Sequence, residues 1–255
     1  MNATKIEVAD SREETARLDL DIRDVSNLFP TKFVPPKPTD TPESLFIRKM
    51  VENHPKHQHL PDQNHRVISR SGNKDILIFT DGACIGNGQA DPKAGCAFVF
   101  RPAKPVGPQP VKYGTFMCRL KNRAELRTVI AAPQNKYWGN EGWERLIITT
   151  NSEYVVNGAT TWIQGWQRKG WVTAKEPVKN QDLWEVLLKE VRMHADRGRY
   201  SLEVLFWLIL WELSKEADAA AKKAALMDDR THFLSYRGVK SSPTEMVTLE
   251  QSRSF

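Results

Sequence analysis

Long hydrophobic runs are absent from this sequence. The longest uncharged apolar run is the eight-residue segment Val204–Trp211, whereas a helix that crosses a bilayer needs about 20 residues. The N-terminal segment MNATKIEVADSREETARL lacks the apolar stretch of a secretory signal and is too acidic for a mitochondrial presequence. We therefore expect no membrane segment and an intracellular protein of the cytoplasm or nucleus.

Cysteine is scarce as well. The three cysteines, Cys84, Cys96 and Cys118, have spacings that fit neither a disulfide framework nor a zinc site, so reduced thiols are expected. Hydrophobic residues make up 40% of the chain and charged residues 27%, which excludes a wholly disordered protein.

Acidic residues are missing from the stretch between Arg101 and Arg123. The net charge is +6, and residues 75–227 hold 21 Lys and Arg against 16 Asp and Glu. Six basic residues fall in the acid-free stretch, namely Arg101, Lys104, Lys112, Arg119, Lys121 and Arg123. Such a stretch is typical of a surface that binds a phosphate backbone, although a solvated loop has the same composition.

Composition divides the chain into three parts: an extension over 1–74, a domain over 75–227 and a tail over 228–255. The extension is expected to be largely irregular because Phe29–Pro42 carries five prolines. His54, His57 and His59 lie in it, but no acid or cysteine completes a metal site, so a linker is favoured. The tail has few large apolar residues and is expected to be disordered.

Five strands are predicted within residues 75–227. They cover Asp75–Thr80, Ala94–Phe100, Val111–Cys118, Arg145–Thr150 and Leu202–Leu210. The turn residues Asp81-Gly82 end the first strand. Helices are predicted from a cap at Asn122 to Ala132, from Ser152, in two Trp-rich pieces, over Gln181–Ala195 and over Lys215–Leu226. This order indicates an α/β fold with a mixed sheet that is covered on both faces.

Acidic residues fall where such a sheet places a ligand crevice. Asp81 follows the first strand and position 151 follows the fourth, while Glu125 and Asp218 lie on the first and last helices. Converging carboxylates repel one another unless divalent cations bind there, and Mg²⁺ or Mn²⁺ suits such oxygen ligands. Each acid alone could instead be a turn residue, a helix-dipole partner or a surface charge.

Four segments resemble those of the ribonuclease H family, of the type-I cellular kind. They are Thr80-Asp81-Gly82-Ala83-Cys84, Asn122-Arg123-Ala124-Glu125-Leu126, Thr150-Asn151-Ser152-Glu153-Tyr154-Val155 and Glu216-Ala217-Asp218. Thr161–Trp184 also resembles the basic protrusion of that family. The resemblance implies a five-stranded sheet of order 3-2-1-4-5 with only strand two antiparallel. It further implies cleavage of the RNA strand of RNA/DNA hybrids by a monomer that uses two Mg²⁺ ions, with Mn²⁺ as a substitute.

Residue by residue, the resemblance assigns Asp81, Glu125, Asn151 and Asp218 to catalysis and metal binding. It assigns the nucleic-acid contacts to Asn87, Gly88, Asn122, Trp162, Trp166, Trp171, Lys169, Lys179 and Asn180. The tryptophans and lysines combine flat faces with cations that pair with phosphates, which suits backbone contacts to the DNA strand. Core packing is the alternative role of the tryptophans.

Three departures from the family pattern bear on activity. Asn151 stands where the family has aspartate, Leu120 stands where a threonine is usual, and no histidine lies between Val204 and Asp218. Two functions therefore stay open: a ribonuclease H slowed by Asn151, and a degenerate relative that binds hybrid or double-stranded nucleic acid without cleaving it. A domain derived from a retroelement is disfavoured because the chain is short and has its own Met1.

Overall fold

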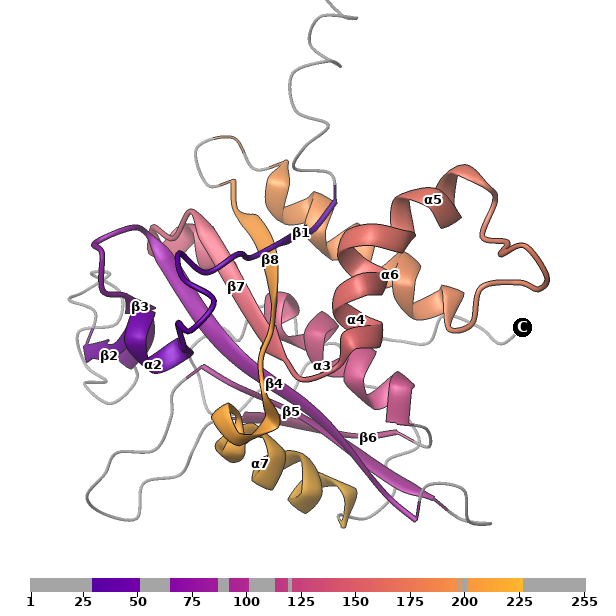
Figure 1. The fold of residues 1–255 in the computed structure, drawn as a ribbon, viewed down its shortest axis with the longest axis horizontal. Helices are drawn as coiled ribbons and strands as arrows, with labels where there is room; N and C mark the ends of the chain where they lie inside the picture. Colours follow the sequence, from indigo (N-terminus) through magenta and orange to yellow (C-terminus); the bar gives the residue numbers. More distant parts are fainter. Residues whose placement is uncertain are drawn as a thin grey trace, which may run out of the picture.

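A mixed β-sheet with helices on both faces forms the centre of the protein (Figure 1). The computed structural model describes residues 29–50, 65–86, 92–100, 113–118, 121–196, 198 and 201–226. The strands that correspond to the five predicted ones are β4 (Asp75–Ile85), β5 (Lys93–Val99), β6 (Tyr113–Cys118), β7 (Arg145–Thr150) and β8 (Glu203–Leu208).

The order of these five strands is the predicted one. β5 is antiparallel to both β4 and β6, whereas β4 and β7, and β7 and β8, pair in parallel. The sequence of neighbours is therefore β6-β5-β4-β7-β8, with only the second strand antiparallel. β4 and β7 are parallel neighbours, and their pairing ends at Phe79 and Thr149. The residues that follow these two positions therefore lie at the same end of the β4–β7 pair.

The extension 1–74 contains regular elements that the sequence did not predict, in the part of it that the structure describes. It contributes α2 (Pro42–Leu45) and three strands, β1 (Thr31–Lys32), β2 (Phe46–Met50) and β3 (His65–Ser69), which enlarge the sheet to eight strands. β3 pairs with the beginning of β4 and β1 pairs with β8. The histidine cluster at 54–59 and the predicted tail 228–255 lie outside the described residues.

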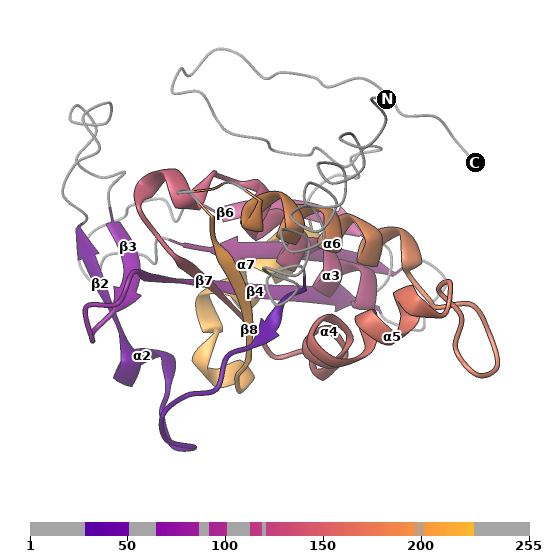
Figure 2. The same cartoon turned by 90° about the horizontal axis from the view of Figure 1, so that it is seen from above.

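The helices occupy both faces of the sheet (Figure 1). On one face lie α3 (Lys121–Gln134), α4 (Glu153–Asn157) and α6 (Gln181–Ala195), and on the other lies α7 (Lys215–Ala225). Figure 2 shows α5 (Ile163–Arg168) beside α4, to which a π-helical segment, Gly158–Trp162, joins it. No helix in these described ranges combines the length and apolar character that crossing a bilayer demands.

One detail of the predicted helices is wrong. Asn122 lies inside the first turn of α3, which begins at Lys121, and therefore does not cap it. The two predicted Trp-rich pieces correspond to the π-helical segment, which ends at Trp162, and α5, which contains Trp166. Trp171 lies beyond both and adopts a left-handed backbone with φ of 63°.

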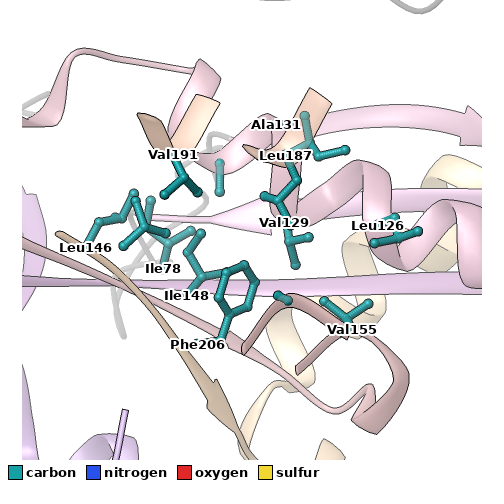
Figure 3. Close-up of a cluster of buried hydrophobic side chains, with 14 of the residues drawn as sticks. Ile78, Leu126, Val129, Ala131, Leu146, Ile148, Val155, Leu187, Val191 and Phe206 are labelled. Atoms are coloured by element: carbon teal, nitrogen blue, oxygen red, sulfur yellow. The ribbon is translucent and has the colours of Figure 1, made fainter. Parts of the chain in front are cut away.

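Two apolar cores lie on opposite faces of the sheet because successive strand residues point to opposite sides. Ile78 and its even-numbered neighbour Ile76 pack with α3, α4 and α6 in the larger core, part of which Figure 3 shows. Leu77 points the other way, into a second core. There it joins sheet residues and the extension's own apolar side chains, including Ile147, Leu205, Trp207, Phe33, Phe46 and Val67. The extension thus completes the second core of the protein.

Candidate active site

The four predicted catalytic residues come from four elements that meet beside β4 and β7. Asp81 lies within β4, and Asn151 directly follows β7. The paired register of these strands ends at Phe79 and Thr149, and continuing it by two residues sets Asn151 beside Asp81. Glu125 lies just beyond the first turn of α3, and Asp218 lies in the first turn of α7. One expectation is wrong: Asp81 does not end its strand, because β4 continues to Ile85.

Gly82 allows α3 to lie directly on β4. A Cβ atom at this position would stand 2.5 Å from the Glu125 backbone nitrogen, which is closer than real Cβ contacts. The neighbouring side chain of Asp81 points to the opposite face, where α7 packs on β4 and β5. Glycine at position 82 therefore brings the acid-bearing turn of α3 close to Asp81.

Asp81 is a buried carboxyl group surrounded by other acids. Burial and the charge of Asp218 raise the pKa of Asp81 to about 6, with a smaller contribution from the charge of Glu125. Asp218 also hydrogen-bonds with the Asp81 carboxyl, and the backbone N–H of Gly82 opposes the rise. A carboxyl group in this setting holds its proton more tightly than usual until a cation offsets the neighbouring charges.

Glu125 is positioned by a residue that the sequence analysis assigned only to a helix start. The Ser152 hydroxyl donates to Glu125 Oε2 at 2.6 Å and also accepts the Val155 N–H at the start of α4. Burial raises the pKa of Glu125, while Ser152 and Lys121 act against the rise. Ser152 could have been identified as a partner only from the pairing of β4 with β7, because Glu125 is 27 residues away in sequence.

Asp218 forms an ion pair within its own helix. Lys222 Nζ donates to Asp218 Oδ2 at 2.7 Å, one turn along α7. The same pattern occurs on α3, where Lys121 Nζ lies 3.8 Å from Glu125 Oε1. The hydrogen bond and charge of Asp218, together with the charge of Asp81, raise the pKa of Lys222.

The donor chemistry of the four residues fits a hard divalent cation. Three carboxylates and an amide oxygen are ligands of the kind that Mg²⁺ prefers, and the charges of Asp218 and Glu125 both act on Asp81. In the described ranges, however, no three His, Cys, Asp or Glu side chains form a group close enough to hold a metal ion. One oxygen of Asp218 is engaged by Lys222, and one oxygen of Glu125 is engaged by Ser152.

Two of the predicted nucleic-acid residues, Trp162 and Trp166, lie in a row of tryptophans with Trp184. The ring of Trp162 lies 5.6 Å from that of Trp166, which lies 5.5 Å from that of Trp184. Trp162 is 40% exposed, whereas Trp166 and Trp171 are half-buried against the larger core. Trp162 thus has the largest exposed fraction of the three predicted tryptophans, and Trp166 and Trp171 also have the packing role that the sequence left open.

Asn180 joins the protrusion to α3 and α4. Its side-chain amide donates to the Tyr154 hydroxyl at 3.1 Å, and its Oδ1 accepts from Arg123 at 3.3 Å. Lys169 and Lys179 are exposed, and Lys179 lies 3.5 Å from Glu176 in an ion pair open to solvent. Asn122 is exposed at the start of α3, whereas Asn87 and Gly88 lie outside the described residues.

Comparison with known proteins identifies relatives for the central part of the chain. The family model for RNase H matches residues 73–197. A ribonuclease HI of Vibrio cholerae is 37% identical over 129 residues, which is 50% of this chain and 76% of that protein. A ribonuclease H of Tolumonas auensis is 35% identical over 161 residues, which is 62% of this chain and 94% of that protein.

A solved structure is also similar. The crystal structure of a type 1 ribonuclease H with the type 2 active-site motif is 25% identical, with a TM-score of 0.43 over 60% of this chain and 72% of that one. The family match and the coverage of the two curated relatives lead to one conclusion. This chain belongs to the ribonuclease H family.

Proposed function

We propose that this protein binds RNA/DNA hybrids and cleaves the RNA strand in a divalent-metal-dependent reaction, with a turnover that Asn151 holds low. The observation that supports the proposal is the interaction of Asp81 with Asp218 and Glu125, at the end of the β4–β7 pair that Asn151 directly follows. Family membership supports a nuclease of the ribonuclease H type.

Asp81, Glu125, Asn151 and Asp218 would hold the ions. When bound, a pair of Mg²⁺ ions supplies an activated water and stabilises the leaving oxygen of a phosphodiester. The chain's own contribution is to orient the ligands. Ser152 fixes one carboxylate oxygen of Glu125, and Gly82 allows the turn that carries Glu125 to approach Asp81.

Charge explains why Asn151 lowers turnover. Two divalent ions bring a charge of +4, whereas Asp81, Glu125 and Asp218 supply −3, and an aspartate at position 151 would supply the fourth negative charge. An amide oxygen still ligates a metal but adds no charge, so the ion nearest position 151 is held less firmly. A weakened ligand set would orient the attacking water less well, and geometric slips of this kind reduce rates by on the order of 10²-fold.

The substrate side of the proposal uses the protrusion. Exposed Lys169 and Lys179 can pair with phosphates of the DNA strand, and the open face of Trp162 can pack on a sugar. None of these contacts reads a base edge. Hybrid recognition would therefore depend on backbone shape and charge.

A second candidate function, hybrid binding without cleavage, is favoured by the turn that joins β8 to α7. Its segment Ile209–Ser214 carries Leu210 and Trp211, which are 70% and 55% exposed, and no histidine. A histidine there would assist proton transfer or product release. The missing histidine and the amide of Asn151 would both lower the rate of cleavage. Neither would alter the proposed binding surface.

The test compares the parent with Asn151→Asp. We expect retained hybrid affinity in both proteins, little or no cleavage by the parent, and a rise of on the order of 10²-fold in cleavage for Asn151→Asp with Mg²⁺. A labelled RNA/DNA hybrid, assayed first with Mg²⁺ and then with Mn²⁺, measures both quantities. Asn140→Asp is the matched control, because Asn140 is an exposed residue of the segment that precedes β7, at the opposite end of that strand.

If the parent cleaves as fast as Asn151→Asp, the amide is an adequate ligand and the charge account is wrong. If neither protein cleaves and both bind the hybrid, the second candidate function is correct.

A further inference from the structure

Two lysines neutralise acids of the proposed metal site from within the same helices. Lys222 Nζ lies 2.7 Å from Asp218 Oδ2 at i,i+4 spacing on α7. Lys121 Nζ lies 3.8 Å from Glu125 Oε1 at the same spacing on α3. Both acids thus have a lysine within ion-pair distance on their own helix.

Lys222 is the more closely engaged of the two. The negative charges of both Asp218 and Asp81 act on its ammonium group, so this cation lies in the field of two proposed metal ligands. Its side chain is 61% exposed, which gives it an open path to solvent. The ammonium group can therefore move away from Asp218 into solvent without displacing the packed core.

The two lysines offset most of the negative charge of the proposed metal site. With Asn151 neutral, the three carboxylates carry −3 and the two ammonium groups +2, so the metal-free site has a net charge of only −1. A divalent ion that binds Asp218 must either take Oδ2 from Lys222 or bind Oδ1 beside that cation. It must also approach a cation within the range where like charges repel.

We propose that Lys222, assisted by Lys121, is an internal counter-cation that occupies the carboxylates of the metal-free site and competes with the incoming divalent ion. This inference rests on the proposed function, because it takes Asp81, Glu125 and Asp218 to be the metal ligands. It assigns to Lys222 a control of metal affinity that is separate from hybrid binding.

The experiment measures Mn²⁺ affinity by calorimetry, at fixed pH and ionic strength, for the parent, Lys222→Gln, Lys121→Gln and Lys223→Gln. Lys223 is the matched control because it is the next residue of α7, equally charged and exposed, and forms no ion pair within the described residues. We expect Lys222→Gln to bind Mn²⁺ roughly two- to tenfold more tightly, the effect of one solvent-screened charge on a divalent ion. Lys121→Gln should have a smaller effect because its ion pair is longer.

A second readout uses stability. In EDTA, Lys222→Gln should melt at a lower temperature than the parent, since Asp218 and Asp81 then repel without a counter-cation. Its melting temperature should rise more than that of the parent when Mn²⁺ is added.

Equal tightening in Lys222→Gln and Lys223→Gln would mean that overall charge, not this ion pair, sets the affinity, and the inference would be wrong. Equal affinity in the parent and Lys222→Gln would also overturn it, while leaving the proposed function intact. Absence of Mn²⁺ binding in every variant would instead overturn the metal site of the proposed function, and this inference with it.

Discussion

Burial and the charges of neighbouring acids act in the same direction on Asp81. Its side chain is buried, and the acids on α3 and α7 both disfavour its ionised form. The result is a pKa of about 6 instead of the ordinary 3.8. Gathering carboxylates in this way lowers the folding stability of the protein at neutral pH.

The raised pKa of Asp81 makes the folding stability depend on pH, and the direction of that dependence can be worked out. Between pH 3.8 and about 6, the folded protein keeps a proton on Asp81 that the unfolded chain has released. The unfolded state therefore binds fewer protons, and the contribution of Asp81 lowers the free energy of unfolding as the pH rises through this interval. Asp81→Asn removes the charge while keeping the shape.

We expect Asp81→Asn to raise the free energy of unfolding at pH 7 by on the order of 2 kcal/mol and to have little effect at pH 4. Urea unfolding in EDTA at the two pH values measures this difference. Glu212→Gln, which removes an exposed acid on the turn before α7, should leave stability unchanged at both. A gain for Asp81→Asn that is the same at pH 4 and pH 7 would show that charge is not its cause.

At the residue scale, the sequence predicted the acids but not their partners. Asp81, Glu125 and Asp218 follow from motif positions, whereas the contact of Ser152 with Glu125 depends on how β7 pairs with β4. The turn predicted at Asp81-Gly82 was wrong because β5 pairs with β4 beyond these residues, and tertiary pairing outweighs the local turn preference.

At the scale of elements, a buried ion pair holds β3 against the domain. Arg66 donates to both carboxylate oxygens of Glu141, at 2.9 and 2.8 Å, and its guanidinium lies 5.5 Å from the ring centre of Phe100. Lys136 adds a second cation at 3.0 Å from Glu141. Burial alone would raise the pKa of Glu141, but the hydrogen bonds and charges of Arg66 and Lys136 lower it to about 2.

Removing Arg66 should be strongly destabilising because it leaves a buried carboxylate without its main partner. We expect Arg66→Met to lower the free energy of unfolding by about 3 kcal/mol at pH 7, and by less as the pH falls from 4.5 towards 2 and Glu141 takes up a proton. Urea unfolding across this pH range measures the effect.

The matched control is Lys74→Met, which breaks an exposed pair with Glu144 whose side chains are 62% and 66% exposed. It should change the free energy of unfolding by less than about 1 kcal/mol. Comparable losses in the two variants would contradict the view that burial gives the Arg66 pair its importance.

Elements of the domain were predictable where they are long, and those of the extension were not. The strand Arg145–Thr150 and the helix Gln181–Ala195 have the predicted bounds. The strands of the extension are two to five residues long and lie within or after a Pro-rich segment, so no periodicity marks them. β1 pairs with β8, β3 pairs with β4, and β2 pairs with β3, and this pairing cannot be read from local sequence.

At the scale of the whole molecule, the net charge of +6 favours binding to a polyanion. Most of the acid-free basic stretch Arg101–Arg123 lies outside the described residues, so its predicted role stays a prediction. The protrusion is described, and its exposed lysines provide the means to test where the backbone of a hybrid lies.

We expect hybrid affinity to fall steeply with salt because phosphate contacts release counterions. The double variant Lys169→Ala/Lys179→Ala should flatten the slope of log affinity against log salt by roughly two contacts. The control, Lys32→Ala/Lys49→Ala, removes two exposed lysines of the extension and should leave the slope unchanged. An unchanged slope in the first variant would exclude the protrusion from the binding surface.

The position of β1 has a consequence for the order of folding. Thr31 pairs with Leu205 and donates to Glu203, a partner 172 residues later in the chain. During synthesis the first strand therefore has no place in the sheet until β8 has been made. Forming such a distant contact is slow because a long loop must close first. Until then Phe33 lacks the partner Trp207, whose ring lies 4.8 Å away in the folded protein. The period between synthesis of β1 and synthesis of β8 is when a newly made chain has most need of a chaperone.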